Sequence, residues 1–341
     1  MKIALDAMGG DYAPEQIVAG AIDAAQCFDC EIVLVGDQDK IQAQLDKFPN
    51  WENLKITVHH ATEVIEMGEH PAAAVRKKKD SSLVVAAQLV KTGECDAVIS
   101  AGSTGAAVTS ALFILGRIAG IARPTIATPI PTGHGVTLLL DSGANVDSKP
   151  KHLQQSALMG SIYSECVFGV ERPRVGLLNI GEEKTKGNEQ VLSTYPLLEN
   201  MHTINFIGNA EGRDITNGTV DVVVCDGFVG NIVLKFAEGL AKTLLKLIKE
   251  AIKNGGFLAK LGALLLAPTL KKIAKKIDYA EYGGAPLLGI DGCYIIAHGS
   301  SNKKAIKSAI GVACEYVKRD VVSRIRENMQ KEEMLANDQE K

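Results

Sequence analysis

The fold is decided by a pattern that is clearest in DVVVCDGFVGN (221–231). A short, continuous apolar run is followed by a glycine-rich turn and then by residues with helical spacing. Such runs are typical of strands that are buried on both faces of a parallel sheet. Four other strand-like runs end in turns of this kind, namely AGSTGA (101–106), DSGAN (141–145), NIGEEKTKGNE (179–189) and GNAEGRD (208–214).

Strands and helices alternate along the rest of the chain. The sequence predicts strands at 2–6, 31–36, 97–100, 136–140, 174–179 and 220–225. It predicts helices that begin at Pro14 and near Asp37, and further helices at 83–91 and 105–116. This alternation indicates an α/β fold, a three-layer sandwich with helices on both faces of a mainly parallel sheet.

The predicted domain organisation follows from the same pattern. Residues 1–320 are expected to form a single α/β catalytic unit, with a helical hairpin inserted at 232–277. Residues 321–341 are polar and rich in charge, and we expect this C-terminal tail to fray.

Composition excludes several classes of protein. With 46% hydrophobic and 23% charged residues, the 341-residue chain has the profile of a soluble globular protein. A net charge of −3 and a single Trp argue against nucleic acid as a partner. The chain has no apolar stretch of about 18 residues and no signal peptide, so we expect a cytoplasmic protein, or one that sits on the cytoplasmic face of a membrane.

Cysteine and histidine patterns predict neither a metal nor a cofactor. Seven scattered cysteines indicate reduced thiols in a cytosol. Cys27 and Cys30 form a C-x-x-C motif without a second pair, and two half-buried thiols at a helix end are the expected arrangement. No H-E-x-x-H motif occurs, and His59-His60 is interpreted as a solvated strand end.

Known ligand motifs are absent from the glycine turns. No G-x-G-x-x-G occurs, which argues against dinucleotide binding. The P-loop spacing also fails, because Gly181 and Gly187 are one residue too far apart and Asn188 stands where lysine is needed. The nucleophile elbow G-x-S-x-G is missing as well. What remains is the handling of phosphate together with an acyl or similar electrophile.

The glycine turns are expected to gather at one edge of the sheet, because ligands of parallel sheets bind beyond the carboxyl ends of the strands. Glycine lets backbone N–H groups approach a ligand, and a helix that starts there adds the positive end of its dipole. We therefore predict an anion site, most naturally for phosphate. Its predicted contacts are Gly9, Gly10, Gly102, Ser103, Thr104, Gly105, Asn145, Gly181, Lys186, Asn209 and Gly227.

Four side chains near these turns are candidates for catalysis. Lys184 is a natural counter-charge for phosphate, although its loop also fits a merely exposed surface. Asp226 is a general base, a hydrogen-bond orienter or only a helix N-cap. Asn231 is able to donate to an oxyanion, and His298 either shuttles a proton or is structural.

A basic amphipathic segment follows the last of these turns. Between Lys235 and Lys276 it contains ten lysines and only two acidic residues, Glu238 and Glu250. Leucines follow the Gly255-Gly256 pair, and we predict that they contact a membrane or an acyl chain; they are Leu258, Leu261, Leu264, Leu265 and Leu266. This composition suits an anionic membrane surface or an acidic protein, and packing against a second subunit is the alternative.

Nine motifs together resemble the PlsX-type family of phosphate acyltransferases. They are DAMGGDYAP (6–14), RKKKDSS (76–82), SAGSTGA (100–106), DSGANVD (141–147), LLNIGEEKTKGNE (177–189), FIGNAEGRD (206–214), DVVVCDGFVGN (221–231), YGGAPLLGIDG (282–292) and AHGSSN (297–302). The resemblance covers about residues 1–320. One departure is Ser103, which stands where the family usually has Asn.

The resemblance implies an enzyme that moves a long-chain fatty acyl group from acyl carrier protein to inorganic phosphate. The acyl phosphate would then serve a membrane glycerol-3-phosphate acyltransferase in phospholipid synthesis. It also implies a homodimer at the cytoplasmic membrane face, with a fold similar to isocitrate and isopropylmalate dehydrogenases and to phosphotransacetylases. Lys184 and the turn amides would hold phosphate, and Arg76–Lys79 or the hairpin would steer the carrier protein.

Two other functions remain open from the sequence. One is a phosphotransacetylase-like enzyme that uses small acyl-CoA substrates. The other is a non-catalytic scaffold on the membrane surface, which recruits partners through residues 235–277.

Overall fold

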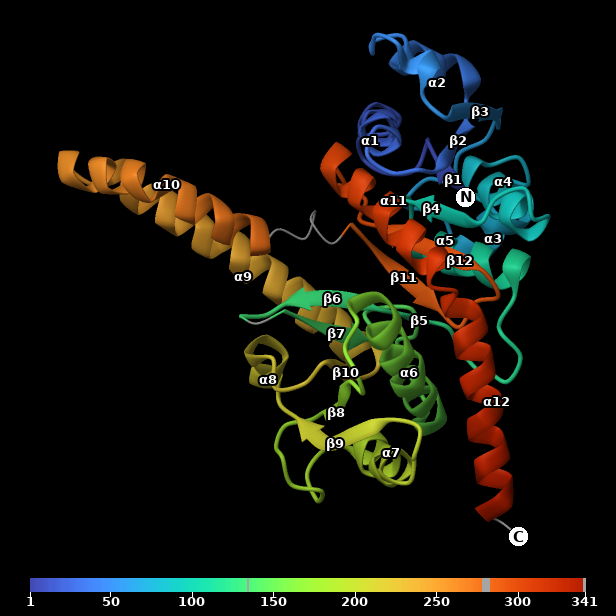
Figure 1. Ribbon diagram of the computed structural model, residues 1–341, viewed down its shortest axis with the longest axis vertical. Coiled ribbons are helices and arrows are strands. Elements are labelled where there is room, and N and C mark those ends of the chain that lie inside the picture. The colour runs from blue at the N-terminus through green and yellow to red at the C-terminus, as the bar shows by residue number, and fades with distance from the viewer. Residues whose placement is uncertain (134, 278–282, 340–341) are drawn as a thin grey trace.

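The computed structural model describes residues 1–133, 135–277 and 283–339, and its strands form two sheets rather than the single sheet expected (Figure 1). The first sheet has the order β3 (Ile56–His60), β2 (Glu31–Gly36), β1 (Lys2–Asp6), β4 (Ala97–Ser100), β12 (Cys293–Ala297), β11 (Gly284–Leu288) and β5 (Thr125–Ile126). The second has the order β6 (Thr128–Pro131), β7 (Val136–Leu140), β10 (Val222–Val224), β8 (Arg174–Leu178) and β9 (Asn205–Ala210).

The α/β class and the mainly parallel pairing are confirmed. In the first sheet, β11 pairs antiparallel with β12 and β5, and the other neighbours are parallel. In the second sheet the β6–β7 pair is antiparallel, and the pairs of β10 with β7 and β8 and of β8 with β9 are parallel. The chain passes from the first sheet to the second through the buried residue Ala127, between β5 and β6.

Helices cover both faces of the first sheet. They include α1 (Glu15–Ala25), α2 (Gln38–Leu45), α3 (Pro71–Lys77), α4 (Ser82–Lys91), α5 (Thr104–Ser110) and α11 (Lys303–Lys318). Side chains of β1 alternate between two cores: Ile3 and Leu5 face the core that contains α1 and α11, and Ala4 faces the core that contains α4. Burial on both faces explains the continuous apolar strands of the sequence.

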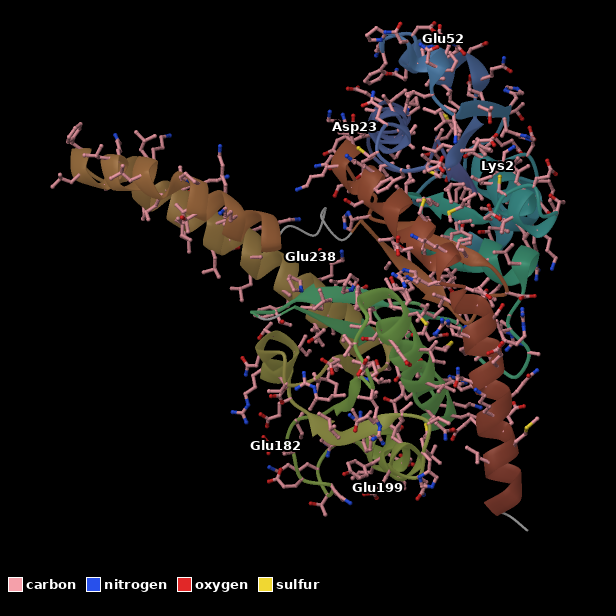
Figure 2. All side chains as sticks on the ribbon, viewed as in Figure 1. Lys2, Asp23, Glu52, Glu182, Glu199 and Glu238 are labelled. Carbon is pink, nitrogen blue, oxygen red and sulfur yellow. The ribbon has the colours of Figure 1, made fainter. Side chains whose placement is uncertain are left out.

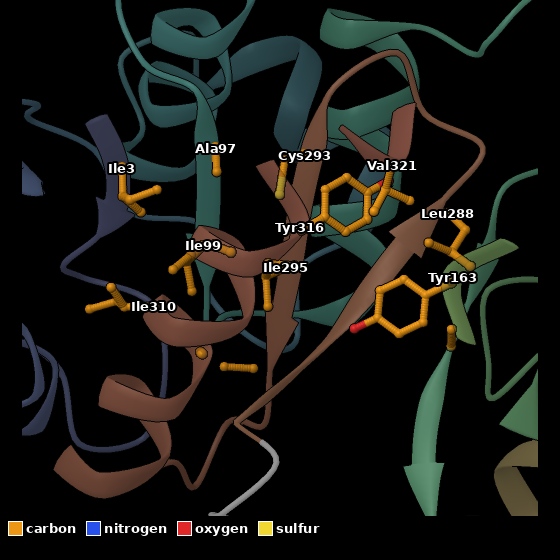
Figure 3. Close-up of a cluster of buried hydrophobic side chains, with 14 of the residues drawn as sticks. Ile3, Ala97, Ile99, Tyr163, Leu288, Cys293, Ile295, Ile310, Tyr316 and Val321 are labelled. Carbon is orange, nitrogen blue, oxygen red and sulfur yellow. The ribbon is translucent and has the colours of Figure 1, made fainter. Parts of the chain in front are cut away.

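One core joins the two sheets. The second sheet packs against α6 (Pro150–Tyr163), α7 (Glu189–Glu199), α8 (Gly212–Asn217) and the start of α9 (Gly227–Asn254). Figure 3 shows Ile3, Ile99 and Ile295 of the first sheet close to Ile310 of α11. The rings of Tyr316 on α11 and Tyr163 on α6 have centroids 6.2 Å apart, so both sheets share this apolar layer.

Two expectations from the sequence are wrong. The C-terminal tail does not fray, because Val321–Gln339 forms helix α12, and Val321, Ile325 and Met329 are buried at helical spacing. The stretch GNAEGRD is not wholly a turn, since Gly208–Ala210 pairs with β8 as the end of β9. Residues 340–341 and the side chains of Lys275 and Lys276 lie outside the described part of the chain.

The basic segment forms the predicted helical hairpin, made of α9 and α10 (Phe257–Ile277). It projects away from both sheets (Figure 1). Helix α9 begins at Gly227, five residues before the predicted start, because Asp226 caps it there. Among the described residues, no helix combines the length and the apolar character that a membrane span requires.

Candidate functional site

Three of the five glycine turns lie at two places, one at the end of each sheet, and the turns after β8 and at the end of β9 belong to neither. We call the loops that follow β1, β4 and β12 the Asp6 site, after the buried aspartate that ends β1. We call the loops that follow β7 and β10 the Asp141 site, after the buried aspartate that follows β7. The predicted single cluster is therefore divided between the two sheets.

Asp6 holds the loop that follows β1. Its Oδ1 accepts hydrogen bonds from the N–H groups of Met8 (3.2 Å) and Gly9 (3.1 Å). Its Oδ2 accepts the hydroxyl of Ser100 at 2.7 Å, and the N–H of Gly102 donates to that hydroxyl oxygen at 3.0 Å. Burial raises the pKa of Asp6, and hydrogen bonds from Ser82 and Ser100 oppose this rise.

The loops of the Asp6 site approach one another so closely that two positions in the loop after β1 require glycine. A Cβ on Gly9 would lie 2.5 Å from Asp6 Oδ2 and 2.9 Å from the backbone nitrogen of Gly102. Gly10 has a φ of +110°, and a Cβ there would lie 3.1 Å from the carbonyl oxygen of Gly299. The N–H groups of Gly9 and Gly102 are both used inside the site, so these two residues support the loops, and their contact with phosphate stays a prediction.

Helix α5 begins in the Asp6 site without a side-chain cap. Ser103 is its N-cap residue and makes no capping hydrogen bond, while Thr104 is exposed. A Cβ on Gly105 would lie 2.7 Å from Pro71 Cγ, so α3 packs against this first turn. The helix continues into a π-helical turn at Ala111–Leu115. Its N-terminal N–H groups and the positive end of its dipole are therefore available to an anion.

Asp141 holds the loop of the second site. Its carboxylate accepts the N–H groups of Ile126 (3.2 Å), Gly143 (3.0 Å), Ala144 (2.9 Å) and Asn145 (2.8 Å). Burial raises the pKa of Asp141, and the backbone hydrogen bonds oppose the rise. The network ties the loop to the end of β5 and leaves the carboxylate enclosed.

Asn145 has a structural position in the Asp141 site. Its Nδ2 donates to Asp141 Oδ2 at 2.8 Å and to the carbonyl oxygen of Pro124 at 2.7 Å, so both amide hydrogens are used. The backbone carbonyl oxygen of Asn145 accepts the N–H of Gly227 at 2.8 Å, and a Cβ on Gly227 would lie 2.5 Å from that oxygen. Gly230 packs against the carbonyl oxygen of Asp141 so closely that no Cβ fits.

The N-terminus of α9 is capped by a side chain. Asp226 is its N-cap and accepts the N–H of Val229 at 2.9 Å, which matches the N-cap alternative for this residue. Asn231 is exposed on the first turn, and its Cγ lies 3.7 Å from the Cβ position of Gly143. A carboxylate at this helix end disfavours a second anion, in contrast to α5.

His298 connects the Asp6 site to the hairpin. Its Nδ1 lies 2.8 Å from the Ser300 hydroxyl, and its Nε2 lies 3.2 Å from Lys235 Nζ on α9. Lys235 also pairs with Glu238, which Figure 2 marks at the base of the hairpin. Partial burial, followed by the charge of Lys235, lowers the pKa of His298. Both causes favour the neutral imidazole.

The two lysines of the loop after β8 form ion pairs with nearby glutamates. Lys184 forms an ion pair with Glu199 on α7, and its Nζ lies 5.2 Å from the Tyr195 ring centroid. The hydrogen bond to Glu199 raises the pKa of Lys184. Glu182 and Glu199, labelled in Figure 2, lie at the far end of the second sheet from β1 and β4. The structure does not bring Lys184 to the Asp6 site.

Two other predicted contacts, Gly181 and Lys186, lie in the same loop, and a third, Asn209, contacts it from β9. Lys186 pairs with Glu183 at 2.9 Å, and its Cδ would lie 2.6 Å from a Cβ on Gly181. Asn209, on β9, donates from Nδ2 to the carbonyl oxygen of Glu183 at 3.0 Å. These contacts stabilise the loop itself.

The predicted leucine contacts are strongly exposed at the hairpin. Leu258, Leu264 and Leu265 expose 80%, 71% and 74% of their surface, and Leu261 and Leu266 are also exposed. Apolar side chains of α9 are exposed alongside them, including Phe236 and Leu247. Such a surface marks contact with a protein or a membrane.

A cavity of about 670 Å³ lies away from both sites. It lies between the end of α6 and the junction of α11 with α12, and its lining includes Glu165, Lys318, Arg324 and Lys331. None of the predicted site residues lines it. Within 1–133, 135–277 and 283–339, no group of three or more His, Cys, Asp or Glu side chains is arranged to hold a metal ion.

Comparison with known proteins identifies the family. A family model described as "Fatty acid synthesis protein" matches residues 1–324. The chain belongs to this family. It is 56% identical over 330 residues to the phosphate acyltransferase of Pelotomaculum thermopropionicum, covering 97% of this chain and 95% of that protein. It is 57% identical over 331 residues to the phosphate acyltransferase of Desulfitobacterium hafniense (strain DSM 10664 / DCB-2), covering 96% and 98%. The resemblance to PlsX-type phosphate acyltransferases is thereby confirmed.

Solved structures support the fold of this chain. A phosphotransacetylase from Streptococcus pyogenes superimposes with a TM-score of 0.62 at 18% identity, covering 93% of this chain and 94% of that chain. The EutD phosphotransacetylase from Staphylococcus aureus gives 0.58 at 17% identity, covering 92% and 94%. The predicted likeness to the phosphotransacetylase fold is confirmed.

Sequence reasoning missed the buried supports of both sites. Asp6, Ser100 and Asp141 were absent from the predicted contacts. A signal was present, because LDAMGG (5–10) and LDSGAN (140–145) share an aspartate at the end of an apolar run, two or three residues before a glycine. An ionisable residue in that position has to be satisfied by the following backbone once the strand is buried.

Proposed function

We propose that this protein transfers an acyl group to inorganic phosphate, and that phosphate binds at the N-terminus of α5. The observation that carries the proposal is the contrast between the two helix starts. No side chain caps α5, and glycine loops from β1 and β4 support its first turn. At α9 the carboxylate of Asp226 already accepts an N–H group. The phosphate acyltransferase name shared by the relatives supports the reaction.

Within this proposal, phosphate contacts the backbone N–H groups of Ser103, Thr104 and Gly105 and the two hydroxyls. Backbone amides at a helix start suit phosphate oxygens, and the helix dipole favours its charge. Ser103 keeps a hydrogen-bonding hydroxyl where the family usually has Asn. The exposed position of Thr104 leaves room for an anion to approach from solvent.

The reaction needs no covalent enzyme intermediate, because phosphate is itself the nucleophile. A phosphate oxygen attacks the thioester carbon, the C–S bond breaks, and the thiolate leaves and takes up a proton. Asn231, or a backbone N–H group, stabilises the tetrahedral oxyanion. His298 is the proposed proton shuttle, since its lowered pKa keeps a neutral imidazole available.

Lys184 is the phosphate ligand predicted from the sequence, and in this role its ammonium has to leave Glu199 and its loop has to move to the start of α5, where the structure does not place it. We expect Lys184→Ala to lower activity at least about tenfold, the loss of roughly 1.4 kcal/mol of transition-state stabilisation. Glu199→Ala frees the same lysine and is the matched control, for which activity is maintained. Equal activity in the two variants would mean that Lys184 acts only through its ion pair with Glu199 and does not bind phosphate.

The proposed acyl donor is a long-chain acyl group on acyl carrier protein, with the basic hairpin as its docking surface. Lysines on the hairpin, such as Lys249 and Lys253, are exposed and complement an acidic carrier. The run Arg76–Lys79 suits this purpose less well, because Lys78 pairs with Glu69 and Arg76 stacks on Phe113 with 5.1 Å to its ring centroid.

The proposed working place is the inner face of the cell membrane, as a homodimer that passes acyl phosphate to a membrane glycerol-3-phosphate acyltransferase. The exposed leucines of α10 beside lysines support contact with an anionic membrane. Replacing Leu264, Leu265 and Leu266 with Ser should release the protein from anionic vesicles in co-sedimentation while soluble turnover persists. Unchanged vesicle binding would favour packing between two copies.

The decisive experiment measures thiol release with and without phosphate. Phosphate-dependent release from long-chain acyl carrier protein, with little from acetyl-CoA, is the expected result. Release from acetyl-CoA alone would favour a phosphotransacetylase-like enzyme. Vesicle binding without turnover of either donor would favour the non-catalytic scaffold.

A further inference from the structure

Asp6 and Ser100 join two glycine loops that are 94 residues apart in sequence. The single hydroxyl of Ser100 has two roles, because it donates to Asp6 Oδ2 at 2.7 Å and accepts the Gly102 N–H at 3.0 Å. Asp6 Oδ1 accepts the Gly9 N–H at 3.1 Å. The carboxylate therefore sets the backbone of both loops through one connected network.

This network is enclosed in the protein. Asp6 exposes 2% of its surface and Ser100 exposes none. Gly9 and Gly102 lie against each other within the network, since a Cβ on either glycine would contact Asp6 Oδ2, at 2.5 Å and 3.7 Å. A buried carboxylate is costly unless its oxygens are satisfied, so the loops have little freedom to rearrange around it.

The residues that directly follow this network are the proposed phosphate contacts. Gly102 precedes Ser103, the N-cap of α5, by one residue. The bond between Gly102 N–H and Ser100 Oγ thus orients the chain as it enters the first turn of the helix. A shift of this turn would misplace the N–H groups that face an anion.

We propose that Asp6 and Ser100 are positioning residues for phosphate, acting through the backbone of Gly102 and the first turn of α5. This inference rests on the proposed function. We expect loss of the Asp6–Ser100 hydrogen bond to weaken phosphate binding. Loss of a structural hydrogen bond farther along α5 should not.

The test compares Ser100→Ala with Ser110→Ala, which removes an equally buried hydroxyl at the other end of α5. Ser110 Oγ contacts the Ala107 carbonyl oxygen and the Tyr294 hydroxyl, both at 2.9 Å. We expect Ser100→Ala to raise KM for phosphate at least about tenfold with kcat changed less than about threefold. We expect Ser110→Ala to leave KM for phosphate unchanged.

A double-variant cycle tests whether the two residues act as one unit. Asp6→Asn should raise KM for phosphate as Ser100→Ala does, and the double variant should add little to either. Where Asp6→Asn fails to fold, the phosphate-induced rise in Tm provides the second measurement: wild type and Ser110→Ala should show it, and Ser100→Ala should lose most of it.

The outcomes separate the inference from the proposed function. Phosphate-dependent turnover in the wild type, combined with an unchanged KM in Ser100→Ala, overturns the inference alone. So does an equal rise of KM in Ser100→Ala and Ser110→Ala. A wild type without phosphate-dependent turnover overturns the proposed function.

Discussion

The Asp6 site and the Asp141 site are built from the same parts and are open to different degrees. In each, an aspartate at the end of a parallel strand is buried and holds a glycine loop by its carboxylate. In each, the neighbouring strand ends in a glycine turn that starts a helix. The difference lies at the helix start, where α9 is capped by Asp226 and α5 has no side-chain cap.

This comparison teaches that a glycine turn before a helix does not by itself make an anion site. In the Asp141 site the donors are used internally, by Asp226 at the helix and by Asp141 and Pro124 at Asn145. In the Asp6 site the internal bonds end at Gly102, one residue before the helix cap. Free donors, rather than glycine content, distinguish the two.

The largest expected effect comes from closing the Asp6 site with a methyl group. Gly9→Ala places a Cβ against Asp6 Oδ2 and the Gly102 nitrogen, so the two loops have to separate. We expect kcat/KM for phosphate to fall at least about 100-fold, roughly 2.7 kcal/mol. Gly239→Ala on α9, where nothing lies within 4 Å, is the control for the same substitution. Comparable kcat/KM values in the two variants would show that the Asp6 site takes no part in the reaction.

A second change makes the start of α5 resemble that of α9. Ser103→Asp puts a carboxylate at the uncapped N-terminus, where it accepts N–H groups and repels phosphate. We expect KM for phosphate to rise at least about tenfold while the protein becomes more stable by about 0.5–1 kcal/mol. Kinetics and thermal unfolding measure the two effects.

Ser103→Asn provides the neutral control, with a side chain of the same shape as Asp. Its amide oxygen also caps the helix but carries no charge, so it should raise KM for phosphate less than Ser103→Asp does. If Ser103→Asp kept the wild-type KM, phosphate would have to bind elsewhere.

The converse change removes the cap of α9. Asp226→Ala should lower the free energy of unfolding by about 1 kcal/mol, because the Val229 N–H loses its acceptor. Asp226→Asn retains a capping oxygen and should be close to wild type in stability. Turnover measurements distinguish a capping role from that of a catalytic base. If Asp226→Asn lost activity at full stability, Asp226 would have a catalytic role.

The smallest expected effect concerns the pKa of His298. Burial is the main cause of its lowered pKa, and Lys235 is the second, so Lys235→Gln should raise this pKa without restoring the ordinary value. NMR titration of the imidazole measures the change. A group whose pKa is lowered by folding adds stability above its unfolded pKa, and this stability is lost as pH falls through the folded value. The variant should therefore lose less stability between pH 7 and 5, and an unchanged pKa would contradict the contact.

Much of the fold was predictable, because its signals are local. Strands β1, β2, β4 and β7 have their predicted bounds, since short apolar runs between polar turns identify buried parallel strands. Helix α12 was mistaken for a fraying tail because its apolar stripe is narrow. Only the tertiary structure shows that this stripe, which contains Val321, Ile325 and Met329, packs into the core.

The candidate site was predictable in part. Gly9, Gly102 and Gly105 stood out as residues of turns, and the structure brings their loops together in the Asp6 site. Lys184 and Asn145 also stood out by residue type, yet their donors are paired with Glu199, Asp141 and Pro124. Pairing depends on residues far apart in sequence, which no motif records.

The sequence by itself determined the α/β class, the family, the position of the glycine turns and the basic hairpin. These properties follow from apolar periodicity, turn chemistry and charge, all of which act over a few residues. Only the tertiary structure decided that the strands divide into two sheets and that the start of α5 stays uncapped while that of α9 does not. Whether an N–H group is free depends on every polar atom that the fold brings within hydrogen-bonding distance.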